Sequence, residues 1–212
     1  MDRLRKLIER VRPYYTSTDP AHDWPHIGRV AALAKKLCDE EKIGSELVLA
    51  AVYCHDLVSY PKDHPDRKLS AEHAARDAGP ILKEAGFNEE EILRIQTLVV
   101  EHSFSKGLKP SSVEAGIVQD ADRLDALGAI GILRCASVNT QMKTSFYDPF
   151  DPLAELRPLD DKNFLLDHYS VKLFKLPELM NTKSGKIEGQ RRCDYMKAFV
   201  AELMNELRIS NR

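Results

Sequence analysis

The stretch SELVLAAVYCHDLV, residues 45–58, decides the fold and raises the first question about chemistry. Its apolar residues recur at helical spacing and Ser45 is a typical N-cap residue, so the stretch predicts a buried helix. His55 and Asp56 interrupt this apolar run. A buried carboxylate costs several kcal/mol unless it is paired or bound to a metal ion. The dipeptide therefore belongs either to a hydrogen-bonded pair inside a helical core or to a metal site, and both interpretations stand at this point.

A second polar interruption lies in GIVQDADRLDALGAIGIL, within an apolar segment that predicts one long helix over residues 111–139. Asp122 and Asp125 are one helical turn apart and share a face, whereas Asp120 lies well round the helix. The helix dipole favours acidic side chains only near the N-terminus, so it gives these residues no support. Two apolar helices that each carry polar residues indicate a polar centre that they share.

The stretch HDWPHIGRV, residues 22–30, contributes a further histidine. Pro25 suits the first turn of a helix, which puts His22 and Asp23 in the preceding loop or cap, with Asp23 a natural N-cap residue. His26 then lies in the first turn, on the side of the helix that packs. His26 is therefore a better candidate than His22 to reach an interior metal ion.

Helical periodicity also covers most of the remaining chain, and no alternating strand pattern competes with it. We expect Ser70 to cap a helix that stops at Gly86, with a kink or break at Pro80, and Asn88 to cap the next helix. Further helices are predicted over residues 27–42, 70–86, 88–102, 164–180 and 189–208.

These patterns predict an all-α fold in a single domain, residues 1–212, with a core at about 20–130 on which C-terminal helices, 162–208, pack. The Pro-rich, acidic segment TSFYDPFDPLAELRPLDDKN, residues 144–163, predicts a long loop. A loop of this length in a compact domain either covers a functional site or packs on the surface, for example as a dimer contact.

The composition limits the class of protein. Of the 212 residues 43% are hydrophobic, enough for a sizeable core, and the net charge of −2 argues against a nucleic-acid partner. No apolar run is long enough to cross a bilayer, and the charged first residues lack the apolar core of a signal peptide. Four cysteines without a CxxC pair are typical of reduced thiols, so we expect a cytoplasmic protein without membrane contact.

In chain order the polar residues form the pattern H…HD…D: His26, then His55 and Asp56, then Asp122. This pattern resembles the HD-domain metal-dependent phosphohydrolase superfamily, an all-α fold in which such residues hold a divalent metal ion. HDLVSYPKDHPDRKLS, EHSFS, VQDADRLDALGAIGI and RPLDDKNFLLDHYSVKLFKLPELMNTKSG resemble, in this order, a bacterial subgroup of stand-alone HD hydrolases. That subgroup is similar to nucleoside-triphosphate pyrophosphohydrolases, and the resemblance spans nearly the whole chain.

The resemblance implies that these residues bind one metal ion, and their chemistry agrees. Imidazole and carboxylate ligands without a thiolate suit Mn²⁺ or Mg²⁺ best, with Fe²⁺, Co²⁺, Ni²⁺ and Zn²⁺ as alternatives. Such an ion lowers the pKa of bound water and polarises a phosphoryl oxygen. We expect Asp56 both to bind the metal and to orient the attacking water.

Other residues are candidates around the metal. His102, in EHSFS, could orient water, protonate a leaving oxygen or contact phosphate, or it could simply be a histidine that a helix C-terminus stabilises. His73 could support the ligands or bind a second ion, and His64 is expected in a solvated loop. A phosphoryl site needs several cations. The candidate phosphate contacts are Arg29, Arg67, Lys68 and Arg123, of which Arg123 could instead pair with a neighbouring acid, and the weaker site candidates are Asp125, His168 and Lys172.

The leading functional hypothesis is a phosphohydrolase of nucleotides or similar small phosphate esters, with pyrophosphohydrolysis of (deoxy)nucleoside triphosphates first. Activity as a 5′-nucleotidase or another phosphomonoesterase or phosphodiesterase is the alternative. Guanosine tetraphosphate and cyclic-nucleotide cleavage fit less well, because HDLVSY lacks an acidic pair after HD and no GYP signature follows. A non-catalytic HD module that senses a nucleotide, and a purely structural helical protein, also stay open. The expected partner is a small phosphate or nucleotide, with homodimerisation as an option.

Overall fold

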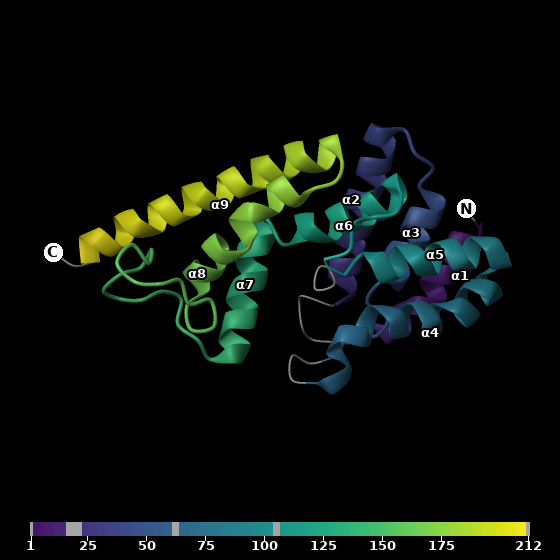
Figure 1. Ribbon diagram of the computed structural model, residues 1–212, viewed down its shortest axis with the longest axis horizontal. Helices are drawn as coiled ribbons and strands as arrows, with labels where there is room; N and C mark the ends of the chain where they lie inside the picture. Colours follow the sequence, from purple (N-terminus) through teal and green to yellow (C-terminus); the bar gives the residue numbers. More distant parts are fainter. Residues whose placement is uncertain (1, 16–22, 61–63, 104–106, 211–212) are drawn as a thin grey trace. The chain divides into compact units, whose positions relative to one another are not determined.

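The computed structural model describes residues 2–15, 23–60, 64–103 and 107–210 (Figure 1). Within these ranges the regular elements are helices, and one isolated bridge joins Ser145 to Phe164. The predicted all-α class is therefore confirmed. The α-helices are α1 (Asp2–Val11), α2 (Trp24–Glu41), α3 (Glu46–Cys54), α4 (Ser70–Ala85), α5 (Glu89–Glu101), α6 (Val113–Asp125), α7 (Gly128–Met142), α8 (Leu165–Val171) and α9 (Lys183–Ser210). Short 3-10 helices are η1 (Arg12–Tyr14), η2 (Pro65–Leu69) and η4 (Leu173–Leu179).

The chain forms two compact units. The first unit comprises Met1–Asp122 and Asn181–Gly185, and the second unit comprises Arg123–Met180 and Lys186–Arg212. Each unit has its own buried apolar residues, among them Ile27 and Ile95 in the first and Leu173 and Met196 in the second. The arrangement in which helices 162–208 pack on a core of residues 20–130 stays a prediction.

Helix α3 is central to the first unit. It packs against α1, α2, α4 and α5. Residues 48–52 and Cys54 are all buried, so α3 is apolar on every side, as expected of a helix enclosed by other helices. The end of α3 therefore lies in the interior of the first unit, where the His55-Asp56 dipeptide follows it.

Helix boundaries agree with the sequence prediction at some positions. Asn88 caps α5 in a capping box with Glu91, as predicted. Gly86 ends α4 with a φ of 102°, which glycine adopts without strain. Ser70 is the first residue of α4 rather than its cap, and α4 continues through Pro80 without a break. Pro80 is exposed, so water can reach the carbonyl that a proline leaves without an amide partner.

The predicted long helix over residues 111–139 is wrong, because the structure has two helices there, α6 and α7. Leu127 is extended and Gly128 has a φ of 73°, a conformation that stops helix propagation and that glycine tolerates. The predicted helix 164–180 is likewise divided into α8 and η4, and α9 begins at Lys183, earlier than residue 189.

The predicted loop at residues 144–163 contains no helix and is fixed by contacts inside the second unit. Arg157 Nη1 donates to the buried carboxylate of Asp167 at 2.6 Å, and its guanidinium lies 4.4 Å from the ring centre of Phe164. Asp151 accepts hydrogen bonds from the backbone amides of Glu155 and Leu156. The loop is thus a packed segment of the second unit, and a role in covering a site stays a prediction.

None of the helices within the described ranges combines the length and the apolar character that a bilayer crossing requires.

Candidate metal centre

The start of α2 places His26 in the interior. Asp23 is the N-cap, and its carboxylate accepts a hydrogen bond from the His26 amide at 2.8 Å. Pro25 occupies the first turn, where its missing N–H costs no hydrogen bond. The side chain of His26 is buried, with 1% exposed. The predicted roles of Asp23 and His26 in the helix start are confirmed, whereas His22 lies outside the described residues.

The end of α3 presents His55 and Asp56. The sequence predicted that both lie within the helix, which is wrong: α3 ends at Cys54, His55 is the C-cap and Asp56 lies in the following turn. A helix end leaves carbonyls that need other donors. His55 supplies one, because its Nδ1 donates to the Val52 carbonyl at 2.7 Å. The same bond orients the ring, which is 2% exposed.

His26, His55 and Asp56 form a group whose ligand atoms all lie within 4.8 Å of one another. Among the His, Cys, Asp and Glu side chains of the described ranges, these three are the ones close enough together to hold a metal ion. The Asp56 Oδ2 atom is 3.7 Å from His26 Nε2 and 3.4 Å from His55 Nε2. The two imidazole rings meet at a centroid distance of 5.6 Å. The sequence predicted that the start of α2 and the end of α3 share a polar centre, and these distances place His26 next to His55 and Asp56.

Asp122 reaches the same group from α6. Its Oδ1 atom is 3.6 Å from His26 Nε2 and 4.0 Å from His55 Nε2. Its side chain is 29% exposed and that of Asp56 17%, so the carboxylates face solvent more than the imidazoles do. Burial raises the pKa of Asp122, but the histidines around it, His55 first, outweigh burial and hold that pKa below its ordinary value. The cluster therefore keeps an ionised carboxylate next to two imidazoles.

The donor set fits a divalent cation. Because His55 Nδ1 donates to a carbonyl, the neutral ring carries its lone pair on Nε2, the atom that faces Asp56 and Asp122. The four nitrogen-to-oxygen separations, 3.4 to 4.0 Å, exceed hydrogen-bond length. They match ligand atoms that each lie about 2.0–2.2 Å from a shared cation. Converging lone pairs at this spacing are more stable with a cation between them than without one.

His102 lies against this group. It is the C-cap of α5, and its Nδ1 donates to the Val99 carbonyl. Its ring meets that of His55 edge to face, with centroids 4.9 Å apart and planes at 82°. Burial, and secondarily His55, lower the pKa of His102, so its neutral form is favoured. The residue that the sequence placed near the metal is thus in contact with a candidate ligand.

The predicted phosphate-binding cations lie in different surroundings. Arg29 follows His26 on α2 and is half-buried, whereas Arg67 and Lys68 are exposed on η2. Arg123 donates to the Leu179 carbonyl at 2.6 Å within the second unit. The structure therefore shows a carbonyl partner for Arg123, and the pairing with a neighbouring acid stays a prediction.

The weaker candidates have partners of their own. His73 Nδ1 is 2.9 Å from the Tyr60 hydroxyl, and His64, expected in a solvated loop, is half-buried and stacks on Tyr60 at 4.3 Å. In the second unit, Asp125 pairs with Arg134 at 2.8 Å, and His168 pairs with Asp161 at 3.1 Å. Lys172 directly follows the last residue of α8. In the part of the chain that the structure describes, none of them belongs to the His26 group.

The sequence did not reveal what Asp120 does. Its carboxylate is 0% exposed and accepts hydrogen bonds from the amides of Asn181 and Thr182 and from the Thr182 hydroxyl, each at 2.8 Å. Burial raises the pKa of Asp120, and these donors offset part of the rise. Asp120 thus anchors α6, which carries Asp122, to the start of α9. The sequence separation of more than 60 residues hides this pairing from any local pattern.

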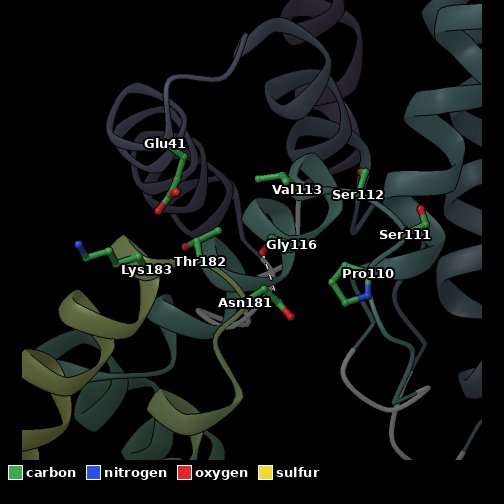
Figure 2. Close-up of a pocket in the computed structure, with 9 residues that line it drawn as sticks. All are labelled: Glu41, Pro110, Ser111, Ser112, Val113, Gly116, Asn181, Thr182 and Lys183. Carbon is green, nitrogen blue, oxygen red and sulfur yellow. Dashed lines mark hydrogen bonds between the residues drawn. The ribbon is translucent and has the colours of Figure 1, made fainter.

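A pocket of about 550 Å³ lies elsewhere in the first unit (Figure 2). Its lining residues are Glu41, Pro110, Ser111, Ser112, Val113, Gly116, Asn181, Thr182 and Lys183. Figure 2 shows Asn181 directed at the Gly116 carbonyl, to which its side-chain amide donates at 3.4 Å. The lining includes neither a histidine nor a cluster of carboxylates. The better candidate for a catalytic centre is therefore the cluster of His26, His55, Asp56 and Asp122.

Comparison with known proteins agrees with this geometry. Residues 24–127, which include the cluster and His102, match the HD domain family. YpgQ of Bacillus subtilis is 30% identical over 207 residues, which cover 95% of this chain and 94% of YpgQ. The crystal structure of YpgQ in complex with ADP has a TM-score of 0.73 at 28% identity and covers 97% of both chains. A crystal structure of an HD-superfamily hydrolase from Bacillus thuringiensis has a TM-score of 0.75 at 30% identity, over 96% of this chain and 95% of that one. This chain therefore belongs to the HD-domain superfamily of metal-dependent phosphohydrolases.

Proposed function

We propose that this protein hydrolyses (deoxy)nucleoside triphosphates to monophosphates and pyrophosphate, with one Mn²⁺ or Mg²⁺ ion held by His26, His55, Asp56 and Asp122. The observation that carries the proposal is the convergence of two Nε2 atoms and two carboxylates at 3.4 to 4.0 Å. The relative YpgQ has been crystallised with ADP, which supports a nucleotide as the substrate class.

A divalent ion bound here would polarise a phosphoryl oxygen and make a water molecule more acidic. The protein side chains then have to orient that water and accept its proton. Asp56 suits the first of these tasks, the orientation of the water, because its Oδ2 atom lies next to both imidazoles and its side chain is 17% exposed. One carboxylate oxygen can serve as a ligand while the other accepts a hydrogen bond from water.

His102 suits the role of a base better than that of an acid. Its Nδ1 is committed to the Val99 carbonyl, so the neutral ring offers an Nε2 lone pair. Because burial lowers the pKa of His102, the ring stays neutral and can accept a proton from water. Of the roles open from the sequence, the proposal therefore places His102 at the attacking water, as its proton acceptor, and rejects protonation of the leaving oxygen.

The triphosphate carries negative charge that the metal ion alone does not balance, so we propose further cations at the site. Arg29 is the first choice, because it lies three residues after His26 in the same helix, about one turn away. Arg67 and Lys68 are exposed cations on η2, near the segment that follows Asp56 in the chain. Arg123 is a weaker choice, since it already donates to a carbonyl.

The test is a panel of nucleoside tri-, di- and monophosphates incubated with the protein and Mn²⁺, with products identified by phosphorus NMR. Release of pyrophosphate from triphosphates is expected. Release of phosphate from monophosphates would instead support a 5′-nucleotidase, and binding without any product would support a nucleotide sensor; either result overturns the proposal.

Asp122→Asn tests the site itself. We expect kcat to fall at least about 100-fold, a loss typical of removing one group that stabilises charge in the transition state. The matched control is Glu114→Gln, an acidic residue of the same helix whose partner is Arg94 at 3.3 Å. The control should keep wild-type activity, and an Asp122→Asn variant as active as wild type would refute the site.

A further inference from the structure

The last carbonyls of α3 show how the turn with His55 and Asp56 is held. A helix ends with carbonyls that lack amide donors. The Val52 carbonyl accepts from His55 Nδ1 at 2.7 Å, and the Cys54 carbonyl accepts from the Leu57 amide at 3.2 Å. Both donors are local. The carbonyl between them, that of Tyr53, is satisfied by a residue from a distant part of the chain.

That residue is Tyr15, which directly follows η1. Its hydroxyl donates to the Tyr53 carbonyl at 2.8 Å, across a separation of 38 residues. Burial, and then the charge of Asp56, raise the pKa of Tyr15 well above its ordinary value, so the hydroxyl keeps its proton. One hydroxyl group thus holds the last turn of α3, directly before the candidate metal ligands His55 and Asp56.

The ring of Tyr15 is also tied to the start of α2. It is 7% exposed and packs on Trp24, the first residue of α2, at a centroid distance of 5.8 Å. Trp24 in turn stacks on Tyr53 at 6.0 Å and 26°. Trp24 precedes His26 by two residues, so Tyr15 contacts both chain segments that supply His26, His55 and Asp56.

We propose that Tyr15 is a positioning residue of the metal centre: its hydroxyl fixes the turn that presents His55 and Asp56, and its ring aligns this turn with the start of α2. Tyr15 does not contact the metal or the substrate in this proposal. It acts through the carbonyl of Tyr53, which lies two residues before His55, so its position helps decide where the ligand atoms lie. The inference rests on the proposed metal site.

Tyr15→Phe removes the hydroxyl and keeps the ring on Trp24, so it separates the hydrogen bond to Tyr53 from the packing. Titration of the metal-free protein with Mn²⁺ by calorimetry should give a dissociation constant about 10-fold larger than that of wild type, the lower end of the effect seen when support of metal ligands is removed. The matched control is Tyr169→Phe, a buried tyrosine of the second unit with 1% exposed. This control should bind Mn²⁺ like wild type.

Hydrogen exchange of the metal-free proteins gives a second measurement that needs no metal. In Tyr15→Phe, amides of residues 52–58 should exchange faster than in wild type, while amides of α4 and α9 should not change. Equal Mn²⁺ affinity of Tyr15→Phe and wild type, or equal exchange over residues 52–58, overturns the role of Tyr15. Absence of Mn²⁺ binding by wild type overturns the proposed metal site instead, so the two failures are distinguishable.

Discussion

His55 and His102 meet edge to face, with ring centroids 4.9 Å apart and planes at 82°. Each ends a helix, and each turns Nδ1 onto the carbonyl three residues earlier. Because α3 and α5 pack against each other, helix packing brings the two capped ends together. Both rings then offer Nε2, which lets His55 serve as a ligand and His102 serve as a base. Both proposed roles thus depend on how the two helices end.

The first prediction concerns His55→Ala. In wild type, Mn²⁺ at about 100 times its dissociation constant should raise the free energy of unfolding by about 2.7 kcal/mol. For a chain of this size, such a gain corresponds to an increase in unfolding midpoint of about 5–10 °C. His55→Ala should abolish the increase, because a ligand atom is lost. The increase in unfolding midpoint is measured by following thermal unfolding with circular dichroism, with and without Mn²⁺.

His73→Ala is the control for that measurement, since His73 bonds to Tyr60 and lies outside the His26 group. It should retain the Mn²⁺-induced increase. An increase that persists in His55→Ala, or that disappears equally in His73→Ala, would contradict the assignment of His55.

Residue patterns predicted much of this molecule because the determining contacts are local. Asp23 caps α2 through an amide three residues away, and Asn88 caps α5 in the same manner. The burial of His26 followed from its place in the first turn of an amphipathic helix. A polar residue in an apolar run needs a partner, so the cluster could be expected before its geometry was known.

Other features depend on contacts that no local pattern records. The break between α6 and α7 depends on the backbone conformation of Gly128, and an apolar sequence continues on both sides of it. Asp120 looks like a member of an acidic cluster, yet its partners are Asn181 and Thr182. Nothing in the local sequence distinguishes Tyr15 from other aromatic residues, and only the structure shows that its hydroxyl donates a hydrogen bond to the Tyr53 carbonyl.

The second prediction concerns Gly185, in the segment that binds Asp120. A methyl group on Gly185 would lie 2.4 Å from Asp120 Oδ2 and 2.7 Å from Thr182 Oγ1. Gly185→Ala should therefore lower the free energy of unfolding by about 1–3 kcal/mol, as overpacking does elsewhere. Urea denaturation measures the change. Gly28→Ala is the control: its added methyl group meets no atom within 4 Å, so helix propensity should stabilise the protein by up to about 1 kcal/mol. A neutral Gly185→Ala would contradict this account.

The third prediction concerns pH and Glu188 in α9. Hydrogen bonding to Arg191, opposed by burial and assisted by Arg192, lowers the pKa of Glu188 from 4.5 to about 2. A carboxyl group with a lowered pKa in the folded state stabilises the protein above its unfolded pKa and loses this effect as pH falls toward the folded value. The stabilisation should be full above about pH 5 and should disappear between about pH 4.5 and pH 2.

Glu188→Gln tests whether the ionised carboxylate of Glu188 stabilises the protein in this pH-dependent manner. Arg191 is 68% exposed, so solvent screening limits the expected loss at pH 7 to about 1–2 kcal/mol. The difference between Glu188→Gln and wild type in urea denaturation should shrink as pH is lowered from 5 to about 3. A difference that stays constant over this range would show that the loss comes from packing rather than from charge.

The fourth prediction concerns Arg157 and the loop at residues 144–163. The Asp167 side chain is 1% exposed and accepts from Arg157 Nη1 at 2.6 Å and Nη2 at 3.0 Å. Arg157→Ala leaves this buried carboxylate without its cation, which should cost about 3 kcal/mol of unfolding free energy. The loop also loses its contact with Asp167, so chymotrypsin should cleave after Phe150, which is 95% exposed, faster than in wild type.

The control for Arg157→Ala is Arg76→Ala, because Arg76 is 66% exposed and its ion pair with Asp77 lies on the surface. Such pairs contribute less than about 1 kcal/mol, so this variant should unfold and cleave like wild type. If Arg157→Ala also behaves like wild type, the remaining hydrogen bond from the Asp160 amide to Asp167 suffices to hold the loop. Faster cleavage after Phe150 without a change in unfolding free energy would show that the ion pair orders only the loop and that the rest of the second unit is stable without it.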